Sequence, residues 1–197
     1  MKAKGIAMTG KTAGPGHFGE DGTTGEMRVG LQDRAAIEDL LIDYCRHLDR
    51  MDLPALARLF TSDCCVIYGP GAHLTAEGAD ALEVSLARMW RWTRTAHHVS
   101  NVRIWHDTDD TARCESYVHA WHERPDGSTA TVYGRYLDLL VRATPGWRIR
   151  ERRMEMNGAD AGFRVAIPQA PRHPPPDGWI APAGLDGPEP RTGGPNG

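Results

Sequence analysis

Residues 95–101 read Thr-Ala-His-His-Val-Ser-Asn, and they mark the point where a helical pattern gives way to a strand pattern. Before them, residues 78–92 carry apolar side chains at helical spacing. After them come the first of four segments with strand character. The junction also presents two neighbouring imidazoles, His97 and His98, beside an apolar helix face. Because the ordinary pKa of histidine is about 6.5, such a ring can take up and release a proton near neutral pH.

The segments around this junction predict an α+β domain over residues 29–160. Apolar residues recur every three or four positions up to about Arg50, with Asp33 as the expected N-cap, and Pro54 begins a second helix that runs to Phe60. A strand over residues 64–68 then separates these helices from the helix over 78–92. The four later strands are expected at residues 97–106, 111–123, 129–142 and 147–156. We therefore expect a cone, in which a curved mixed or antiparallel sheet wraps around three N-terminal helices and encloses a pocket.

Both ends of the chain lack this patterning. Residues 1–28 are rich in Gly and Thr and are expected to be disordered, because they have too few apolar side chains to offset the entropy of ordering. Residues 161–197 are rich in Pro and Gly and are expected to form a tail.

Composition excludes several classes of function. With a net charge of −3 over 197 residues and no run of Lys or Arg, the chain has no electrostatic signature of nucleic-acid or anionic-membrane binding. No apolar run is long enough to span a bilayer, and no apolar stretch follows Lys2 and Lys4 as a secretory signal requires. The four cysteines form no C-x-x-C motif, which argues against a zinc site or a disulfide framework. The sequence predicts a soluble cytoplasmic protein that needs no metal or cofactor.

Strand alternation assigns only part of the pocket. In the segment 111–123, His122 falls on the face of small and apolar side chains and is predicted to point inward, with His119 outward. Rings on opposite faces of a strand do not form a metal site together. In the segment before it, alternation favours His98 over His97 as the inward ring, unless a bulge near Ser100 changes the phase.

Five motifs carry a family resemblance. They are Tyr44 followed by Asp49 and Asp52, and the runs Leu59-Phe60-Thr61-Ser62-Asp63, Arg94-Thr95-Ala96-His97, Asn101-Val102-Arg103-Ile104 and Gly146-Trp147-Arg148-Ile149. Over residues 31–157 the chain resembles the nuclear-transport-factor-2-like (NTF2-like) or SnoaL-like superfamily. It is most similar to the branch that contains scytalone dehydratase, hexachlorocyclohexane dehydrochlorinase and bile-acid 7α-dehydratase.

The resemblance implies roles for particular residues. Asp49 and His97 match the family's catalytic acid–histidine pair, so the resemblance favours His97 where alternation favours His98. His122 matches a second catalytic histidine, and Tyr68 matches a tyrosine that holds a water molecule or a carbonyl. Four further residues are implied as substrate contacts: Tyr44, Arg152, Asn101 and Tyr136.

These residues point to proton-transfer chemistry. If the Asp49 carboxylate accepts a hydrogen bond from the His97 ring, the other ring nitrogen can act as a general base. We expect a cofactor-independent dehydratase, isomerase or cyclase that acts on a hydrophobic, oxygenated small molecule, with His122 or Tyr68 as a second proton donor. Two alternatives stay open: a binding protein of the same fold without catalysis, and the small subunit of a ring-hydroxylating dioxygenase. A homo-oligomer, trimer or dimer, is also expected, because aromatic residues such as Tyr117 and Trp121 fall on the outer face of the sheet.

Overall fold

The computed structural model describes residues 29–160 and 177–178, so the predicted disordered segment and nearly all of the predicted tail lie outside the described residues. The elements follow one another as α1 (Leu31–Asp49), α2 (Leu53–Ala57), β1 (Phe60–Ile67), the 3₁₀ helix η1 (Ala72–Leu74), β2 (Thr75–Glu77), α3 (Ala79–Leu86), the 3₁₀ helix η2 (Ala87–Arg91), β3 (Arg94–Thr108), β4 (Thr111–Glu123), β5 (Thr129–Ala143) and β6 (Gly146–Ala159). None of the helices in this described part is both long and apolar enough to cross a bilayer.

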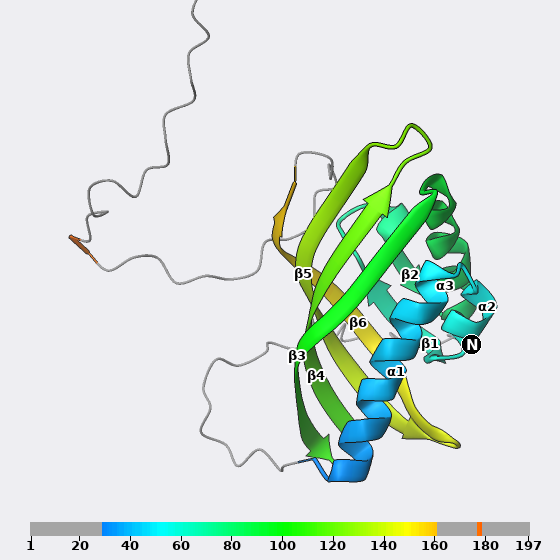
Figure 1. Cartoon of the computed structure of the whole chain (residues 1–197). Coiled ribbons are helices and arrows are strands. Elements are labelled where there is room, and N and C mark those ends of the chain that lie inside the picture. Colours follow the sequence, from blue (N-terminus) through cyan, green and yellow to red (C-terminus); the bar gives the residue numbers. More distant parts are fainter. Residues whose placement is uncertain (1–28, 161–176, 179–197) are drawn as a thin grey trace, which may run out of the picture.

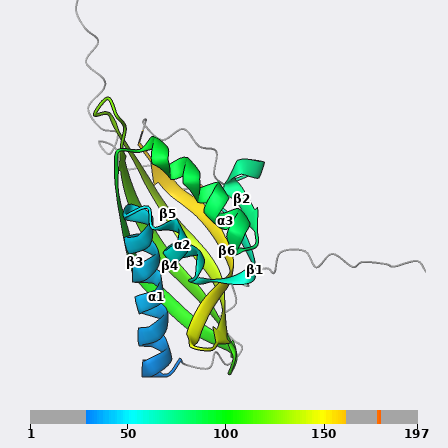
Figure 2. The ribbon, with the colours of Figure 1, turned by 90° about the vertical axis from the view of Figure 1, so that its right-hand side faces the viewer.

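The six strands form one curved mixed sheet in the order β2-β1-β6-β5-β4-β3 (Figure 1). Strands β3 to β6 are antiparallel neighbours, whereas β1 pairs parallel to β6. The helices cover the concave side of the sheet, where α1 packs against β3 and β6, and α3 packs against β1 and β2 (Figure 2). The predicted α+β cone is confirmed.

Helix α1 forms because one of its faces is continuously apolar. Its buried residues recur at three- and four-residue spacing and fill the concave side of the sheet: Ile37, Leu40, Leu41, Tyr44, Cys45 and Leu48. The predicted N-cap at Asp33 is wrong, because the helix starts three residues earlier than that cap requires and Gly30 occupies the cap position. The Asp33 carboxylate instead accepts hydrogen bonds from Arg142 (2.9 and 2.8 Å) and from Trp147 Nε1 (3.0 Å). These bonds fasten the start of α1 to the β5–β6 hairpin.

The second helix is shorter than the sequence predicts. Asp52 caps it, since its Oδ1 accepts a hydrogen bond from the Ala55 N–H at 3.2 Å, but the helix ends at Ala57. Phe60, expected as the last helical residue, instead opens β1 and pairs with Ile149 of β6. This long-range parallel pairing, together with the short strand β2, is invisible in local periodicity.

Candidate active site

Asp49 and His97 meet where the end of α1 approaches the start of β3. His97 Nδ1 lies 2.6 Å from Asp49 Oδ1, and the His97 backbone N–H donates to Oδ2 at 3.0 Å. The Thr95 hydroxyl donates to Oδ1 at 2.8 Å. The His97 side chain is 4% exposed and that of Asp49 26%, so the contact is largely shielded from water.

Three donors keep the Asp49 carboxyl ionised. Burial raises its pKa, but the hydrogen bonds from His97 and Thr95 outweigh this effect, so the pKa lies below its ordinary value. These bonds also offset the unfavourable position of a negative charge at the C-terminal end of a helix. The ionised carboxylate therefore accepts a hydrogen bond from His97 Nδ1–H, which leaves the lone pair of the ring on Nε2.

A bulge in β3 decides which histidine points inward. His97 pairs with the buried Ala120 of β4, while His98 is exposed beside His119 on the outer face. The register then shifts between Ser100 and Arg103, where Asn101 adopts a left-handed backbone with φ 49°. One extra residue reverses the alternation of side chains. Odd-numbered residues of β3 therefore face the concave side before the bulge, and even-numbered residues such as Ile104 face it after the bulge.

His122 is the second histidine of the site. Its ring stands edge-on to that of His97, with centroids 5.4 Å apart, and it also packs against Trp92 at 4.8 Å. Its Nδ1–H donates to the Ala130 carbonyl at 3.2 Å, which places the ring lone pair on Nε2. Burial, and then the nearby His97, lowers the pKa of His122 to about 4, so the ring is neutral at neutral pH.

Two tyrosines supply hydroxyl groups to the same space. The hydroxyls of Tyr44, on α1, and Tyr68, just after β1, are hydrogen-bonded at 2.7 Å, and Tyr136 of β5 packs edge-on against Tyr44 at 5.8 Å. Burial raises the pKa of both hydrogen-bonded tyrosines above the ordinary value, so both keep their protons. Tyr136 is also hydrogen-bonded to Tyr44, so the three hydroxyls form a row in which one O–H remains as a donor.

Arg152 lies behind these tyrosines. It forms a two-pronged ion pair with Asp138 (2.8 and 2.7 Å), and both side chains are fully buried. Its guanidinium lies 4.1 Å from the ring centre of Tyr44 and 4.2 Å from that of Tyr136. Arg152 therefore supports the cavity wall from outside and is not among the lining residues.

A single cavity gathers most of the predicted site residues. Side chains do not fill the cavity. Its volume of about 60 Å³ is large enough for several water molecules. The lining residues come from α1, from the segment between β1 and β2, from α3 and η2, and from four strands: Tyr44, Leu48, Tyr68, Leu74, Leu86, Arg88, Met89, Arg91, His97, Ala120, His122, Val132, Tyr136 and Met154.

Two of the predicted substrate contacts are not part of this wall. Asn101 is exposed at the β3 bulge, where it affects which side chains of the strand face inward. Arg152 lies one layer behind the wall. Sequence reasoning also missed Arg88 and Arg91, which do line the cavity. Their three-residue spacing in the segment just before the His97 junction was the available signal.

The described residues contain no group of three or more His, Cys, Asp or Glu side chains placed to hold a metal ion. His119 in particular is exposed on the outer face, where it stacks on Tyr133 with ring centres 4.7 Å apart.

A curved mixed sheet closed by helices around an apolar pocket, lined by a histidine that is paired with a carboxylate behind it, defines an NTF2-like protein. The sequence profile of the SnoaL-like domain matches residues 30–153, and the chain belongs to this family.

Solved structures of similar proteins agree with this assignment. A protein from Novosphingobium aromaticivorans, provisionally named a scytalone dehydratase, is 31% identical, with a TM-score of 0.67 over 73% of this chain and 97% of its own. A provisionally named aromatic ring hydroxylase from the same organism is 26% identical, with a TM-score of 0.63 over 68% and 95% of the two chains. The hexachlorocyclohexane dehydrochlorinase of Novosphingobium barchaimii shares the fold at 20% identity, with a TM-score of 0.59 over 70% and 97%. A comparison with curated protein sequences gives no match.

Proposed function

We propose that this protein is a cofactor-independent lyase or isomerase of the dehydratase or cyclase type, with His97 as the general base. The observation that carries the proposal is the 2.6 Å contact between Asp49 Oδ1 and Nδ1 of His97, a residue that lines an apolar cavity. Asp49 itself is not a lining residue and holds the ring from behind. Similarity to the protein provisionally named a scytalone dehydratase supports the same class of reaction.

In a dehydration, His97 Nε2 takes a proton from the carbon next to a carbonyl group. Asp49 holds the ring in the required tautomer and stabilises the imidazolium that forms, as in other acid–histidine pairs. The C–H electron pair becomes a C=C bond, the C–O bond at the neighbouring carbon breaks, and the hydroxyl leaves as water with the proton that His97 Nε2 has taken up, which restores the neutral ring. No electrons are gained or lost overall, so the reaction requires no redox partner.

The tyrosine pair is better suited than His122 to donate a hydrogen bond to the substrate oxygen. Tyr44 and Tyr68 keep their protons, whereas the Nδ1–H of His122 is directed to the Ala130 carbonyl. We assign the tyrosines to the developing negative charge on the carbonyl oxygen, where a positioned donor has most effect. His122 is assigned to position the departing hydroxyl by accepting its O–H through Nε2, so that the oxygen faces the proton held by His97.

The test is turnover of β-hydroxy ketones, beginning with 3-hydroxycyclohexanone, whose loss of water creates an absorbing enone. We expect His97→Gln and Asp49→Asn to lower kcat/KM about 10²–10⁴-fold, the usual contribution of a general base, with unchanged circular dichroism. His98→Gln is the matched control, because that ring is exposed on the outer face, and it should retain full activity.

Equal activity of wild type and His97→Gln would refute the catalytic role. Binding of the ketones without any turnover across the β-hydroxy ketone panel would favour a binding protein. Purification with a large iron-containing partner would favour the dioxygenase subunit, a possibility kept open by the relative provisionally named an aromatic ring hydroxylase.

A further inference from the structure

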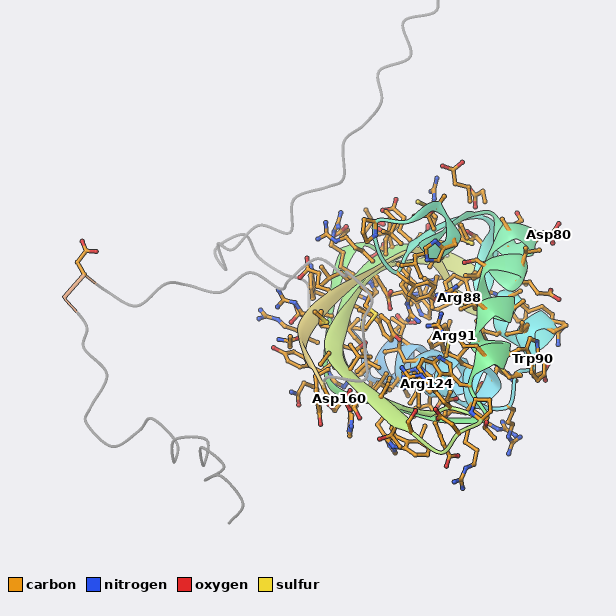
Figure 3. The ribbon with its side chains drawn as sticks, turned by 90° about the horizontal axis from the view of Figure 1, so that it is seen from above. Asp80, Arg88, Trp90, Arg91, Arg124 and Asp160 are labelled. Atoms are coloured by element: carbon orange, nitrogen blue, oxygen red, sulfur yellow. The ribbon has the colours of Figure 1, made fainter. Side chains whose placement is uncertain are left out.

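Two arginines stand at the mouth of the cavity. Arg88 and Arg91 are three residues apart in η2 (Ala87–Arg91), and side chains at this spacing lie on the same side of a 3₁₀ helix. Seen from above, both point from the helix toward the middle of the ring that sheet and helices form, whereas Trp90 points outward (Figure 3). Both line the same cavity as His97 and His122.

Each guanidinium is held near the aromatic groups of the site. Arg88 donates hydrogen bonds to the Ser85 carbonyl and to Ser85 Oγ (2.9 Å), and its guanidinium lies 5.2 Å from the ring centre of Tyr68. Arg91 lies 5.0 Å from the ring centre of Trp92, the residue that packs against His122. One positive charge is thus placed beside Tyr68, a proposed donor, and the other beside the aromatic ring that packs against His122.

These two charges are not balanced by carboxylates. In the described part of the chain, neither Arg88 nor Arg91 has an ion pair, whereas Arg94, Arg142 and Arg152 are each paired with an acid. Burial lowers the pKa of Arg91, and the charged neighbours that lower it further are both cations, Arg88 and Arg124. Arg124 and Asp160 also lie at this end of the molecule (Figure 3), and both have other contacts.

An anion between the two guanidiniums would relieve this repulsion. The planar fork of arginine matches carboxylate and phosphate oxygens, and such charge-assisted hydrogen bonds are about twice as strong as neutral ones. Below the mouth the cavity wall is apolar, with Leu74, Leu86, Met89 and Val132. The site therefore matches a molecule with an apolar body and one acidic group.

We propose that Arg88 and Arg91 form an anion-binding subsite, and that the natural substrate is an apolar ring compound carrying a carboxylate or phosphoryl group. The acidic group binds at the mouth while the ring occupies the cavity and presents a C–H bond to His97. This role in catalysis rests on the proposed function, whereas the binding preference is measured separately.

The experiment is a calorimetric or NMR titration at low salt with three probes of similar size: benzoate, phenyl phosphate and the neutral benzamide. We expect at least one anion to bind ten-fold or more tightly than benzamide, and the better anion to identify the natural acidic group. Added salt should reduce this preference, because the mouth is open to water.

Arginine variants assign the preference to residues. Arg91→Gln should abolish it, and so should Arg88→Gln. If Arg88→Gln perturbs folding through the lost Ser85 bonds, Arg91→Gln still decides, since no hydrogen bond from its side chain is described. Arg58→Gln changes the charge equally at an exposed position beside α2 and should bind the anions as wild type does. The proposal would be overturned if benzamide bound as tightly as the anions. It would also be overturned if Arg58→Gln weakened anion binding as much as Arg91→Gln does.

The outcome separates this inference from the proposed function. Arginine-dependent anion binding without His97-dependent turnover would leave the subsite standing and refute the lyase. Turnover of neutral ketones that depends on His97, without any preference for anions, would support the lyase and refute the subsite.

Discussion

His97 and His122 have nearly touching rings in one cavity, yet their surroundings differ. His97 faces the ionised Asp49, whereas the Nδ1–H of His122 donates to the neutral carbonyl of Ala130. A carboxylate stabilises an imidazolium that forms beside it, while a carbonyl compensates much less for burial. The two rings are therefore suited to different tasks, which agrees with the proposal of His97 as the general base.

The low pKa of His122 predicts a pH-dependent stability. Between about pH 6.5 and about pH 4 the unfolded chain binds a proton that the folded ring does not, so stability falls as the pH decreases through this window. Below it both states are protonated and the contribution no longer changes. In urea unfolding, the free-energy difference between wild type and His122→Gln should shrink by roughly 1–3 kcal/mol from pH 7 to pH 4.

His119→Gln is the control, because it removes an imidazole from an exposed position. The pH dependence of its stability should match that of the wild type. A wild-type and a His122→Gln stability curve that stay parallel across this pH range would contradict the prediction.

At the scale of single elements, β3 is the strand whose geometry determines the site. Its bulge places His97 and, after the phase change, Ile104 on the same concave side. Asn101 makes this possible because asparagine tolerates the left-handed backbone better than other residues with a Cβ, apart from aspartate. Asn101 thus contributes to the site through its backbone conformation, although its side chain is exposed.

We predict that Asn101→Gly keeps wild-type stability and that Asn101→Val loses about 1–2 kcal/mol, the cost of a left-handed conformation, or more for a β-branched side chain. The measurement is the free energy of unfolding in urea, with turnover as a second readout. Ser100→Val, at the exposed neighbouring position, should be tolerated because valine suits a strand. A stable Asn101→Val protein would show that the bulge does not depend on this residue.

At the scale of the whole molecule, the Arg152–Asp138 pair joins the sheet to the cavity wall. The ion pair links β5 and β6, and its guanidinium supports Tyr44 of α1 and Tyr136 of β5. Burial opposes the charge of Arg152, but Asp138 outweighs this effect and the pKa of Arg152 is raised. The pair is therefore charged, buried and well oriented.

Removing one partner should cost more than removing both. Asp138→Leu alone is expected to lower the free energy of unfolding by roughly 3–5 kcal/mol, because it leaves a buried charge without its partner. Arg152→Met alone is expected to do the same, while the double variant should recover a large part of the loss. A double-mutant cycle in urea measures this coupling, and additive losses would contradict it.

Local patterns in the sequence predicted much of the fold. Helical spacing identified α1, strand alternation identified β4 with His122 on its inner face, and turn residues identified the hairpins around β5. Each of these depends on a period of two or 3.6 residues and on short-range turn chemistry, which neighbouring residues encode.

The sequence by itself therefore determined the α+β class, the order of the long strands and the two neighbouring histidines at one junction, while the pairing of His97 with Asp49 was implied only by the family resemblance. Tertiary structure decided what depends on partners distant in the chain. It decided that β1 runs parallel to β6, that Arg152 stands behind the wall and that Arg88 and Arg91 reach the mouth. It also decided that His97 and not His98 faces the concave side of the sheet. A bulge is defined only by the register with the neighbouring strand, which local sequence does not contain.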